Sequence, residues 1–422
     1  MKGREVAEQI LIKLGKKIRT SKFRNQYFEN QRAFQRKRKL PLDVLISFLM
    51  ERSTKSYDLK ISDWVSNQEF ERELPLTKQA VSKARQKIPA KLFEDIFYDS
   101  SISYLHESTD KKTWNGYQVL AVDATDFQIP TTEETKAYFG EIKGQHATKL
   151  AGASASTLCD VLNGVLLSAV IKPFRTGERV MAKEVIGKII AELDKKNTII
   201  VFDRGYPGYE FLEYLTEKQI QYVIRIKEQM TLLRTPGKAD GKVYRKWGKK
   251  CREIRTIEVE LDEKRREYLI TNLPQERVSG EKFKELYHMR WGIEGKYREL
   301  KSQLEIEAFS GKKVVCIEQD FYITMFLANI VSLVKNETDE CIRKEQKAKR
   351  KSEYQANRGY LIHQVNRAIS RLLLESSQVE TVIKSIIEKG KKIRSQIRGN
   401  RKCERNKNLN RRKYCMTYKS CI

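Results

Sequence analysis

The sequence lacks several patterns that would define its class directly. Its seven cysteines, at positions 159, 251, 316, 341, 403, 415 and 421, include no Cys-x-x-Cys pair. An odd number of cysteines without that spacing indicates neither a disulfide framework nor a zinc site, so a reducing cytoplasm is expected. The chain also has no glycine-rich phosphate-binding loop and no internal repeat.

Long apolar runs are missing too. Near the N-terminus the only apolar run is Ile10 to Ile12, which is too short for a signal peptide. The most apolar stretch, Phe321 to Val334, contains Thr324, Asn329 and Ser332. It is also shorter than the ~20 residues that a bilayer requires. We therefore predict a buried helix there and no membrane association.

Positive charge, in contrast, is abundant and concentrated at the ends. The chain has 422 residues, enough for two or three domains, and a formal net charge of +28. Residues 1–39 hold 13 Lys and Arg against 3 acidic residues, and residues 389–413 hold 12 against Glu404 alone. Basic ends on a nearly balanced body favour a nucleic-acid partner, with nonspecific solubilising tails as the alternative. The final basic stretch is poorly patterned, so we expect it to be disordered without DNA.

A helical period organises the stretch from Tyr287 to Lys301, which we interpret as one helix. Five residues fall within about a third of its circumference: Tyr287, Arg290, Trp291, Glu294 and Lys301. A separate apolar stripe would pack on a core: Leu286, Met289, Ile293, Tyr297, Leu300 and Leu304. On the first of these faces the carboxylate suits a metal ion, and the two cations and the phenol suit phosphate oxygens. A solvated amphipathic helix is the alternative. Gly292 and Gly295 predict a close approach to the backbone, because each costs ~1 kcal/mol inside a helix.

Two apolar runs earlier in the chain lead into aspartates. Residues 117–130 are interpreted as a strand in which Asp123 closes the apolar run, and Asp126 is the competing candidate. Residues 198–202 form a second apolar strand, followed by Asp203. An isolated aspartate after a strand is more often a cap or a turn. Here the two aspartates and Glu294 would be three carboxylates at strand ends and on a helix face.

The order of the predicted elements indicates the fold class. It is α/β, a ribonuclease-H-like mixed sheet with a β-strand insertion, flanked by N- and C-terminal helical regions. The further elements are strands at 149–158, 165–174 and 221–226, a turn at Asn163-Gly164, and helices at about 178–194 and 207–218. The insertion spans about 228–276 and contains a hairpin of residues 252–261 and 268–270. Trp247 within it would either stack on an extruded base or anchor the insertion.

We expect three regions. Residues 1–110 are helical, basic and DNA-binding; residues 111–310 are the catalytic domain; residues 311–422 are C-terminal helices, at 314–337 and 358–388, and a basic tail. In the first region, residues 41–50 form a core helix, and residues 76–88, capped by Thr77, resemble the second helix of a helix-turn-helix. A surface helix of a small bundle is the alternative. The side chains available for DNA would be Lys78, Gln79, Ser82, Lys83 and Arg85.

The spacing Tyr287, Arg290, Glu294, Lys301 resembles the Tyr-Arg-Glu-Lys signature of bacterial insertion-sequence DDE transposases, including the Trp291 and Ile293 context. The family pattern, in which a small residue and Thr follow the first aspartate, selects Asp123. Asp203 is followed by Arg-Gly-Tyr, as in many family members. The resemblance implies that Asp123, Asp203 and Glu294 are catalytic metal ligands. It also implies DNA contacts by Tyr287, Arg290, Trp291, Lys301 and Arg204.

Three converging carboxylates repel one another, and two divalent ions roughly 3.5–4 Å apart would relieve that repulsion. Hard oxygen ligands favour Mg²⁺, with Mn²⁺ as a substitute. The resemblance implies a transposase that cleaves double-stranded transposon ends and joins them to target DNA, often through a hairpin. It would be a homodimer on DNA, in the bacterial cytoplasm and associated with the nucleoid. The alternatives are a metal-dependent nuclease of the same fold and a catalytically silent DNA-binding repressor.

Overall fold

The computed structural model describes residues 1–28, 34, 40–67, 76–143, 149–230, 233–235, 238–247, 250–262, 265–345 and 352–397. They divide into two compact units, each of which is described by itself. The sheet unit comprises Lys111–Asp126 and Ser154–Arg298. The helical unit comprises Met1–Asp110, Phe127–Ala153 and Glu299–Ile422.

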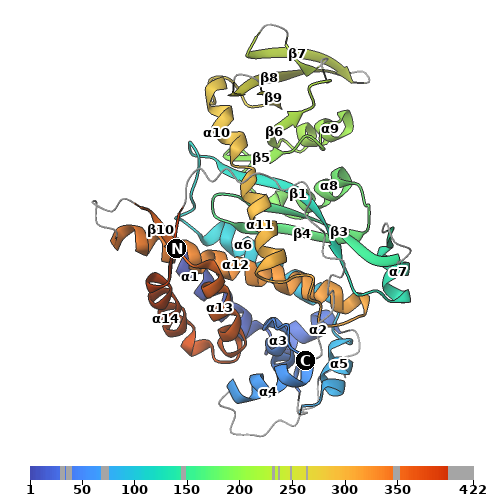
Figure 1. The fold of residues 1–422 in the computed structure, drawn as a ribbon, viewed down its shortest axis with the longest axis vertical. Helices are drawn as coiled ribbons and strands as arrows, with labels where there is room; N and C mark the ends of the chain where they lie inside the picture. The colour runs from blue at the N-terminus through green and yellow to red at the C-terminus, as the bar shows by residue number, and fades with distance from the viewer. Residues whose placement is uncertain are drawn as a thin grey trace. The chain divides into compact units, whose positions relative to one another are not determined.

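A mixed sheet forms the framework of the sheet unit (Figure 1). Its strands are β1 (Gln118–Gln128), β3 (Lys149–Asp160), β4 (Val165–Pro173), β5 (Thr198–Phe202), β6 (Gln221–Ile226), β7 (Asp240–Trp247), β8 (Lys250–Asp262) and β9 (Arg265–Thr271). With β2 (Glu141–Lys143), the strand order is β2-β3-β1-β5-β6-β9-β8-β7, and β4 pairs with β3. Strands β1, β5 and β6 are parallel, whereas β6, β9, β8 and β7 pair antiparallel. This order confirms the predicted ribonuclease-H-like mixed sheet with a β insertion.

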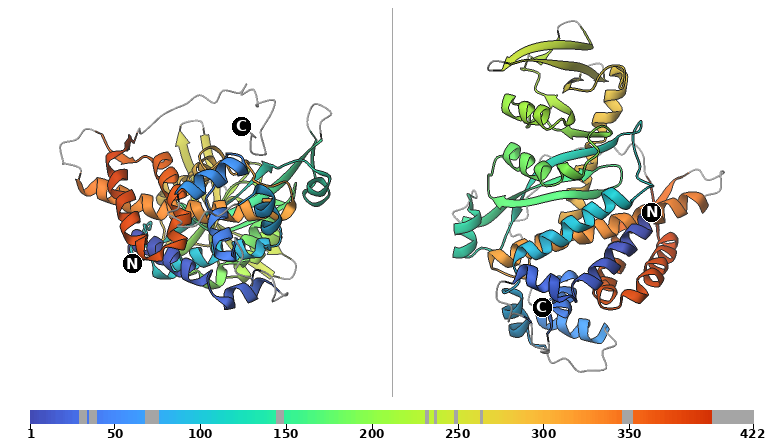
Figure 2. Two further views of the ribbon diagram at one scale, coloured as in Figure 1. Left: turned by 90° about the horizontal axis from the view of Figure 1, so that it is seen from below. Right: turned by 180° about the vertical axis from the view of Figure 1, so that it is seen from behind.

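Helices cover both faces of this sheet, as the predicted fold requires. Figures 1 and 2 show α8 (Glu178–Gly187) and α9 (Tyr209–Glu217) on one face, and α10 (Phe283–His288) and α11 (Trp291–Ser302) on the other. Every residue of β5 is buried, because a central parallel strand has no solvated face. Helix α8 is shorter than expected, since the chain leaves the α-helix after Gly187 and makes a 3₁₀ turn at Ile190–Glu192.

The insertion is larger than the predicted hairpin. Strands β8 and β9 form that hairpin, but β9 also pairs with β6 and β7 pairs with β8, so the insertion extends the main sheet. Strand β7 was not expected, because its sequence is rich in Lys and Arg, as suits a sheet edge. The side chain of Trp247 lies outside the described residues, so its two predicted roles stay predictions.

The helical unit is built around the long helix α12 (Val314–Glu345), against which α1 (Gly3–Lys17), α6 (Ala90–Glu107), α13 (Arg358–Leu374) and α14 (Val379–Lys392) pack. The remaining elements of this unit are α2 (Ser21–Tyr27), α3 (Leu42–Met50), α4 (Tyr57–Asn67), α5 (Lys78–Arg85), α7 (Glu133–Phe139), β10 (Tyr354–Ala356) and β11 (Arg394–Gln396). By length and composition α12 alone among the described helices could cross a membrane, but 83% of its most apolar window is buried. This finding agrees with the predicted buried helix.

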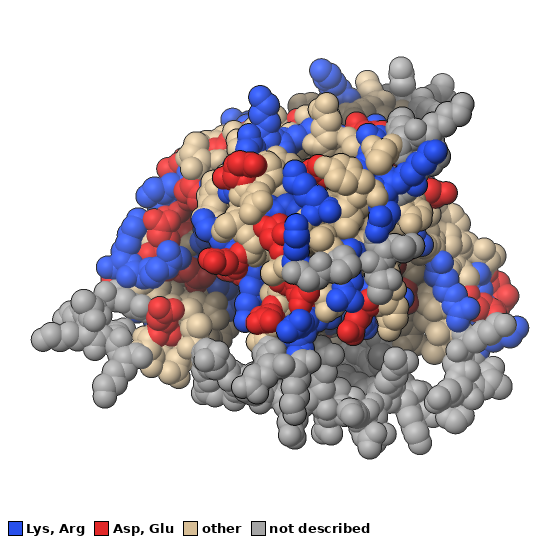
Figure 3. Space-filling view, turned by 90° about the horizontal axis from the view of Figure 1, so that it is seen from above, with Lys and Arg blue, Asp and Glu red and all other residues tan. Residues whose placement is uncertain are grey.

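The described surface carries mixed charge. On the face in Figure 3, Lys and Arg side chains alternate with Asp and Glu. At the C-terminal end, the expectation of disorder is wrong for residues 389–397. Lys391 in α14 pairs with Glu345 at 2.8 Å, and β11 pairs with β10. Packing of the α14 apolar face orders this part of the basic stretch, and residues 398–422 lie outside the described residues.

Candidate active site

Parallel pairing of β1 and β5 brings Asp123 and Asp203 to the same part of the sheet. The last paired residues are Ala121 and Val201, so each aspartate lies two residues beyond a paired position. Side chains two residues apart in a strand share a face, and neighbouring strands lie about 4.8 Å apart. We expected Asp123 at a strand end, but β1 continues to Gln128. Asp123 instead lies within β1, beyond its last pair with β5.

The predicted single helix from Tyr287 to Lys301 is in fact two helices, α10 and α11, joined at Met289 and Arg290. The backbone tightens to 3₁₀-type bonds there: the Gly292 amide donates to Met289 O at 2.9 Å, and that of Ile293 to Arg290 O at 3.1 Å. A Cβ at Gly292 would lie 3.0 Å from Val161 Cβ and 3.2 Å from its carbonyl oxygen. The predicted close approach therefore holds at Gly292. It does not hold at Gly295, where a Cβ would meet nothing within 4 Å.

A buried tyrosine one turn after Glu294 attaches α11 to strand β1. The Tyr297 hydroxyl donates to the Asp123 carbonyl oxygen at 2.8 Å and accepts from Thr157 Oγ1 at 3.0 Å. Ser156 Oγ donates to the same carbonyl at 3.0 Å. Because residues three apart on a helix share a face, this contact orients Glu294 toward Asp123. The sequence indicated Tyr297 only as a member of the apolar stripe, since hydroxyl partners far apart in the chain leave no local signal.

Electrostatics links the three carboxylates. The pKa of Asp123 is raised to about 6, chiefly by burial and also by the charges of Asp203 and Glu294, while the Ala124 amide and Arg290 lower it. Glu294 Oε1 accepts from Arg290 Nη2 at 2.7 Å. Asp203 Oδ1 accepts from the Gly205 amide at 2.6 Å. The site is thus a cluster of negative charge with one cation bound to it, which is an arrangement that favours added cations.

The five residues predicted to contact DNA differ in exposure. Arg290 and Tyr287 are buried, with Arg290 lying 5.9 Å from the centre of the Tyr287 ring. Trp291 is 46% exposed, and Arg204 is exposed. Lys301 belongs to the helical unit, where its ammonium lies 5.0 Å from the centre of the Phe127 ring. Within the sheet unit the structure therefore brings Tyr287 and Arg290 to the carboxylates, and it leaves Trp291 and Arg204 accessible.

Two further residues of the sheet unit lie at the site, and the sequence did not single them out. Glu178 and Asp203 both lie against Gly205. A Cβ at Gly205 would be 2.8 Å from Glu178 Oε2 and 3.7 Å from Asp203 Oδ1. Burial raises the pKa of Glu178, and the charges of Asp203 and Asp126 raise it further. Tyr206 is buried, and its hydroxyl has no hydrogen-bond partner among the described residues. Tyr206 ends the Arg-Gly-Tyr motif, which predicted no role for it, and Glu178 shows no pattern because it simply begins a helix.

Asp126, the competing first aspartate, has a different environment. Its Oδ1 accepts from Ser154 Oγ at 2.6 Å. In an extended strand, residues 123 and 126 point to opposite faces. Arg290 and Glu294 both act on the pKa of Asp123. These contacts favour Asp123 as the partner of Glu294.

The helix predicted at residues 76–88, which resembles the second helix of a helix-turn-helix, is present as α5, but one of its predicted DNA contacts is wrong. Thr77 caps α5 by accepting from the Ala80 amide at 3.2 Å, as expected. Arg85 is not available to DNA, because it is 1% exposed and its guanidinium binds partners within the helical unit. Those partners are Gln319 Oε1 at 2.7 Å, Tyr57 Oη at 2.8 Å, Cys316 O at 2.8 Å, Asp320 Oδ1 at 2.9 Å and Ser310 Oγ. Lys83 is exposed, so the basic face of α5 is smaller than predicted.

The sequence of the chain is similar to those of known transposases. Residues 114–330, about half of the chain, match the family model described as Transposase DDE domain. The chain is 27% identical to InsZ of Escherichia coli (strain K12) over 187 residues, 43% of this chain and 60% of InsZ. It is 24% identical to the transposase InsG for insertion sequence element IS4 of the same organism over 322 residues, 70% of each chain. A cryo-EM structure of the piggyBac transposase synaptic complex with hairpin DNA aligns with a TM-score of 0.48 and 9% identity, over 91% of this chain and 84% of that one.

Proposed function

The chain belongs to the Transposase DDE domain family, and on that premise we propose that Asp123, Asp203 and Glu294 are its catalytic carboxylates. The observation that carries this proposal is their convergence: the β1–β5 register aligns the two aspartates, and Tyr297 fixes the helix of Glu294 to Asp123. We also place the chain in the class with the Tyr-Arg-Glu-Lys signature. The matching residues are Tyr287, Arg290, Glu294 and Lys301.

Membership in this family implies the use of a divalent metal, and the site residues fit that requirement. Carboxylate oxygens are hard ligands, and Asp123 is buried within electrostatic range of two further carboxylates, those of Asp203 and Glu294. We propose that Asp123, Asp203 and Glu294 hold two Mg²⁺ ions, which Mn²⁺ can replace. When bound, such ions activate the attacking oxygen and stabilise the leaving one. The pairing of Arg290 with Glu294 keeps the helix carboxylate oriented and partly neutralised beforehand.

Arg290 is proposed as a phosphate ligand as well as the partner of Glu294. Its Nε is buried and has no hydrogen-bond partner among the described residues, so one donor of the guanidinium is free for a phosphate oxygen. The Tyr287 phenol lies beside it, and burial raises its pKa to about 12, so it remains a neutral donor at physiological pH. Lys301, Trp291 and Arg204 are proposed to complete the DNA contacts.

The proposed reaction is hydrolytic cleavage of double-stranded transposon ends, followed by attack of the freed 3′-hydroxyl on target DNA. None of these steps requires a nucleophilic side chain, which agrees with a site composed of carboxylates. A homodimer on DNA is proposed, because two ends must be held together, and the protein would act at the bacterial nucleoid. A nuclease without strand transfer and a silent repressor are the competing functions.

The test combines three assays with the full chain and its flanking genomic DNA in Mg²⁺: gel shift, strand nicking and joining to a target plasmid. Asp123→Asn, Asp203→Asn and Glu294→Gln keep the shape of each side chain and remove the charge. We expect each variant to bind DNA normally and to cut at least about a thousandfold more slowly, since each 1.36 kcal/mol is tenfold in rate.

Asp126→Asn is the matched control, because it removes the same charge three residues away on the same strand. It should cut at a rate close to that of the unmodified protein. Loss of cutting in Asp126→Asn with retention in Asp123→Asn would transfer the role to Asp126. Cutting without joining would establish the nuclease, and binding without cutting by the unmodified chain would establish the repressor.

A further inference from the structure

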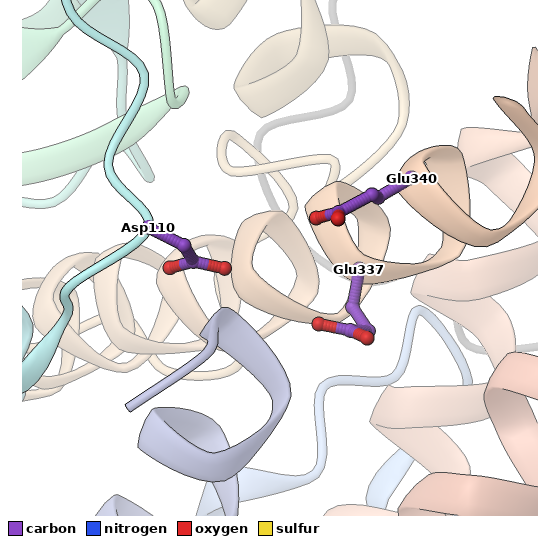
Figure 4. Close-up of side chains that lie close together, drawn as sticks. All are labelled: Asp110, Glu337 and Glu340. Carbon is purple, nitrogen blue, oxygen red and sulfur yellow. The ribbon is translucent and has the colours of Figure 1, made fainter. Parts of the chain in front are cut away.

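The helical unit contains an acidic cluster that is separate from the catalytic carboxylates. Figure 4 shows Asp110, from the segment that follows α6, facing Glu337 and Glu340 of α12. One ligand oxygen from each residue lies within 4.8 Å of the other two, and this is the only such acidic group among the described residues. Any three points so spaced have a common centre no more than about 2.8 Å from each, close to the Ca²⁺–oxygen distance of roughly 2.3–2.6 Å.

One of these side chains is buried, and one of its oxygens lacks a hydrogen-bond partner among the described residues. The side chain is that of Glu337, which is 9% exposed, and the oxygen is Oε2. A carboxylate oxygen that is removed from water without a donor is unfavourable, so a bound cation would be favourable there. Glu337 and Glu340 are also three residues apart on one helix, where like charges destabilise the helix.

The other two carboxylates are held in place by donors of the same unit. Asp110 Oδ2 accepts from the Gly3 amide at the start of α1 at 3.2 Å, and Oδ1 accepts from Ser108 Oγ at 3.1 Å. Lys344 pairs with Glu340 Oε1 at 2.6 Å, and that hydrogen bond holds the pKa of Glu340 below its usual value. Both groups are therefore oriented, and a carboxylate oxygen retains further lone pairs for a cation.

We propose that Asp110, Glu337 and Glu340 bind one divalent cation of the Ca²⁺ type, independently of the catalytic site. The cation would join the beginning of α1, the end of the α6 segment and the last third of α12. Its role is to stabilise the helical unit, because it relieves the repulsion within the cluster and supplies the missing partner of Glu337. Ca²⁺ should bind more tightly than Mg²⁺, since Mg²⁺ requires shorter distances of about 2.0–2.1 Å in octahedral geometry.

The test separates this site from the catalytic one. The full chain carrying Asp123→Asn, Asp203→Asn and Glu294→Gln is titrated with CaCl₂ and with MgCl₂ by calorimetry, and its melting temperature is measured with and without each ion. We expect one Ca²⁺ per chain and a rise in melting temperature that grows with Ca²⁺ concentration. Absence of Ca²⁺ binding, or tighter binding of Mg²⁺, would overturn the assignment.

Adding Glu337→Gln and Glu340→Gln to that background should weaken Ca²⁺ binding at least tenfold and abolish the thermal shift. The same two substitutions should leave the metal-free melting temperature unchanged or higher, which shows that the variant folds. Glu133→Gln, at a side chain that is 94% exposed on α7, removes an equal charge elsewhere and should have no effect on Ca²⁺ binding. Unaltered Ca²⁺ affinity in the doubly substituted chain would refute the site.

Discussion

The two units treat buried charge in opposite ways. In the helical unit, Arg85 is buried and its guanidinium is surrounded by hydrogen-bond acceptors, including Asp320 at 2.9 Å. Asp320 in turn accepts from the Ser310 amide at 2.6 Å and lies 3.5 Å from Arg52. In the sheet unit, Asp123, Asp203 and Glu294 share a site in which Arg290 donates a hydrogen bond to Glu294 and also lowers the pKa of Asp123. The first cluster is satisfied by protein atoms, whereas the second has an excess of negative charge.

The comparison suggests a criterion that distinguishes a structural charge from a functional one, namely whether the fold supplies partners for it. A buried ion that has all its partners stabilises one arrangement of the chain, and removing one partner is strongly destabilising. A buried carboxylate whose pKa is raised, as that of Asp123 is, makes the folded protein less stable at neutral pH than it would be without the charge, and such groups are retained at functional sites. Each of the following substitutions tests one side of that comparison.

The largest effect on stability is expected for Arg85→Met. It leaves Asp320 buried without its main partner, so the free energy of unfolding should fall by about 3–5 kcal/mol. Urea unfolding measures this change. Lys83→Met, on the exposed face of the same helix, is the control and should change the free energy by less than about 0.5 kcal/mol. If Arg85→Met unfolds like the unmodified protein but fails in gel shift, Arg85 is a DNA contact after all.

Asp123→Asn is expected to stabilise the metal-free protein. The pKa of Asp123 is about 6 in the folded chain, above its usual 3.8, so ionisation opposes folding and stability falls as pH rises between these values. At pH 8 in EDTA the substitution should therefore raise the free energy of unfolding by up to about 3 kcal/mol. At pH 4 the gain should largely vanish.

The control for that experiment is Asp126→Asn, which weakens the hydrogen bond from Ser154 and should bring no gain at either pH. Urea unfolding at the two pH values, with EDTA present throughout, provides the comparison. If the Asp123→Asn protein is less stable than the unmodified chain at pH 8, the ionised Asp123 carboxylate must have favourable partners within the folded protein.

A smaller effect is expected for Tyr297→Phe, which removes the hydroxyl between α11 and β1. The hydroxyl donates to Asp123 O and accepts from Thr157 Oγ1, and each lost hydrogen bond costs about 1 kcal/mol. Because the bond to Asp123 orients the Glu294 helix, the rate of strand nicking should fall about tenfold while DNA affinity stays the same. Tyr214→Phe removes a comparable bond, to Lys183 O at 3.1 Å, and should lower stability alone. Equal nicking rates in the two variants would exclude a positioning role for Tyr297.

The smallest change in stability is expected from deletion of residues 398–422. These residues hold 9 Lys and Arg against Glu404, whereas residues 389–397 are part of α14 and β11 and must be kept. The deletion should weaken binding to all DNA sequences alike and flatten the salt dependence, because fewer counterions are released. An unchanged slope of log affinity against log salt would exclude this segment as a DNA contact.

Much of the fold was predictable because it depends on local periodicity. Strand β6 and helix α3 follow their apolar runs closely, and Asn163-Gly164 forms the expected turn, with Gly164 at φ 65°. Strand β7 was missed because an edge strand needs little apolar sequence. The break between α10 and α11 was missed because the apolar period continues across it. At this break Val161 lies against Gly292, and those residues are distant in the chain.

The sequence by itself determined the candidate carboxylates and the basic ends, because residue type and spacing carry that information. The tertiary structure determines which charged side chains are exposed and which are buried among partners. Arg85 and Lys83 lie on one short helix and look alike in sequence, yet only Lys83 is exposed. Asp110 is separated from Glu337 and Glu340 by more than two hundred residues and meets them only when α12 packs beside the end of α6. Charge is a local property, but its balance depends on neighbours that folding brings from elsewhere in the chain.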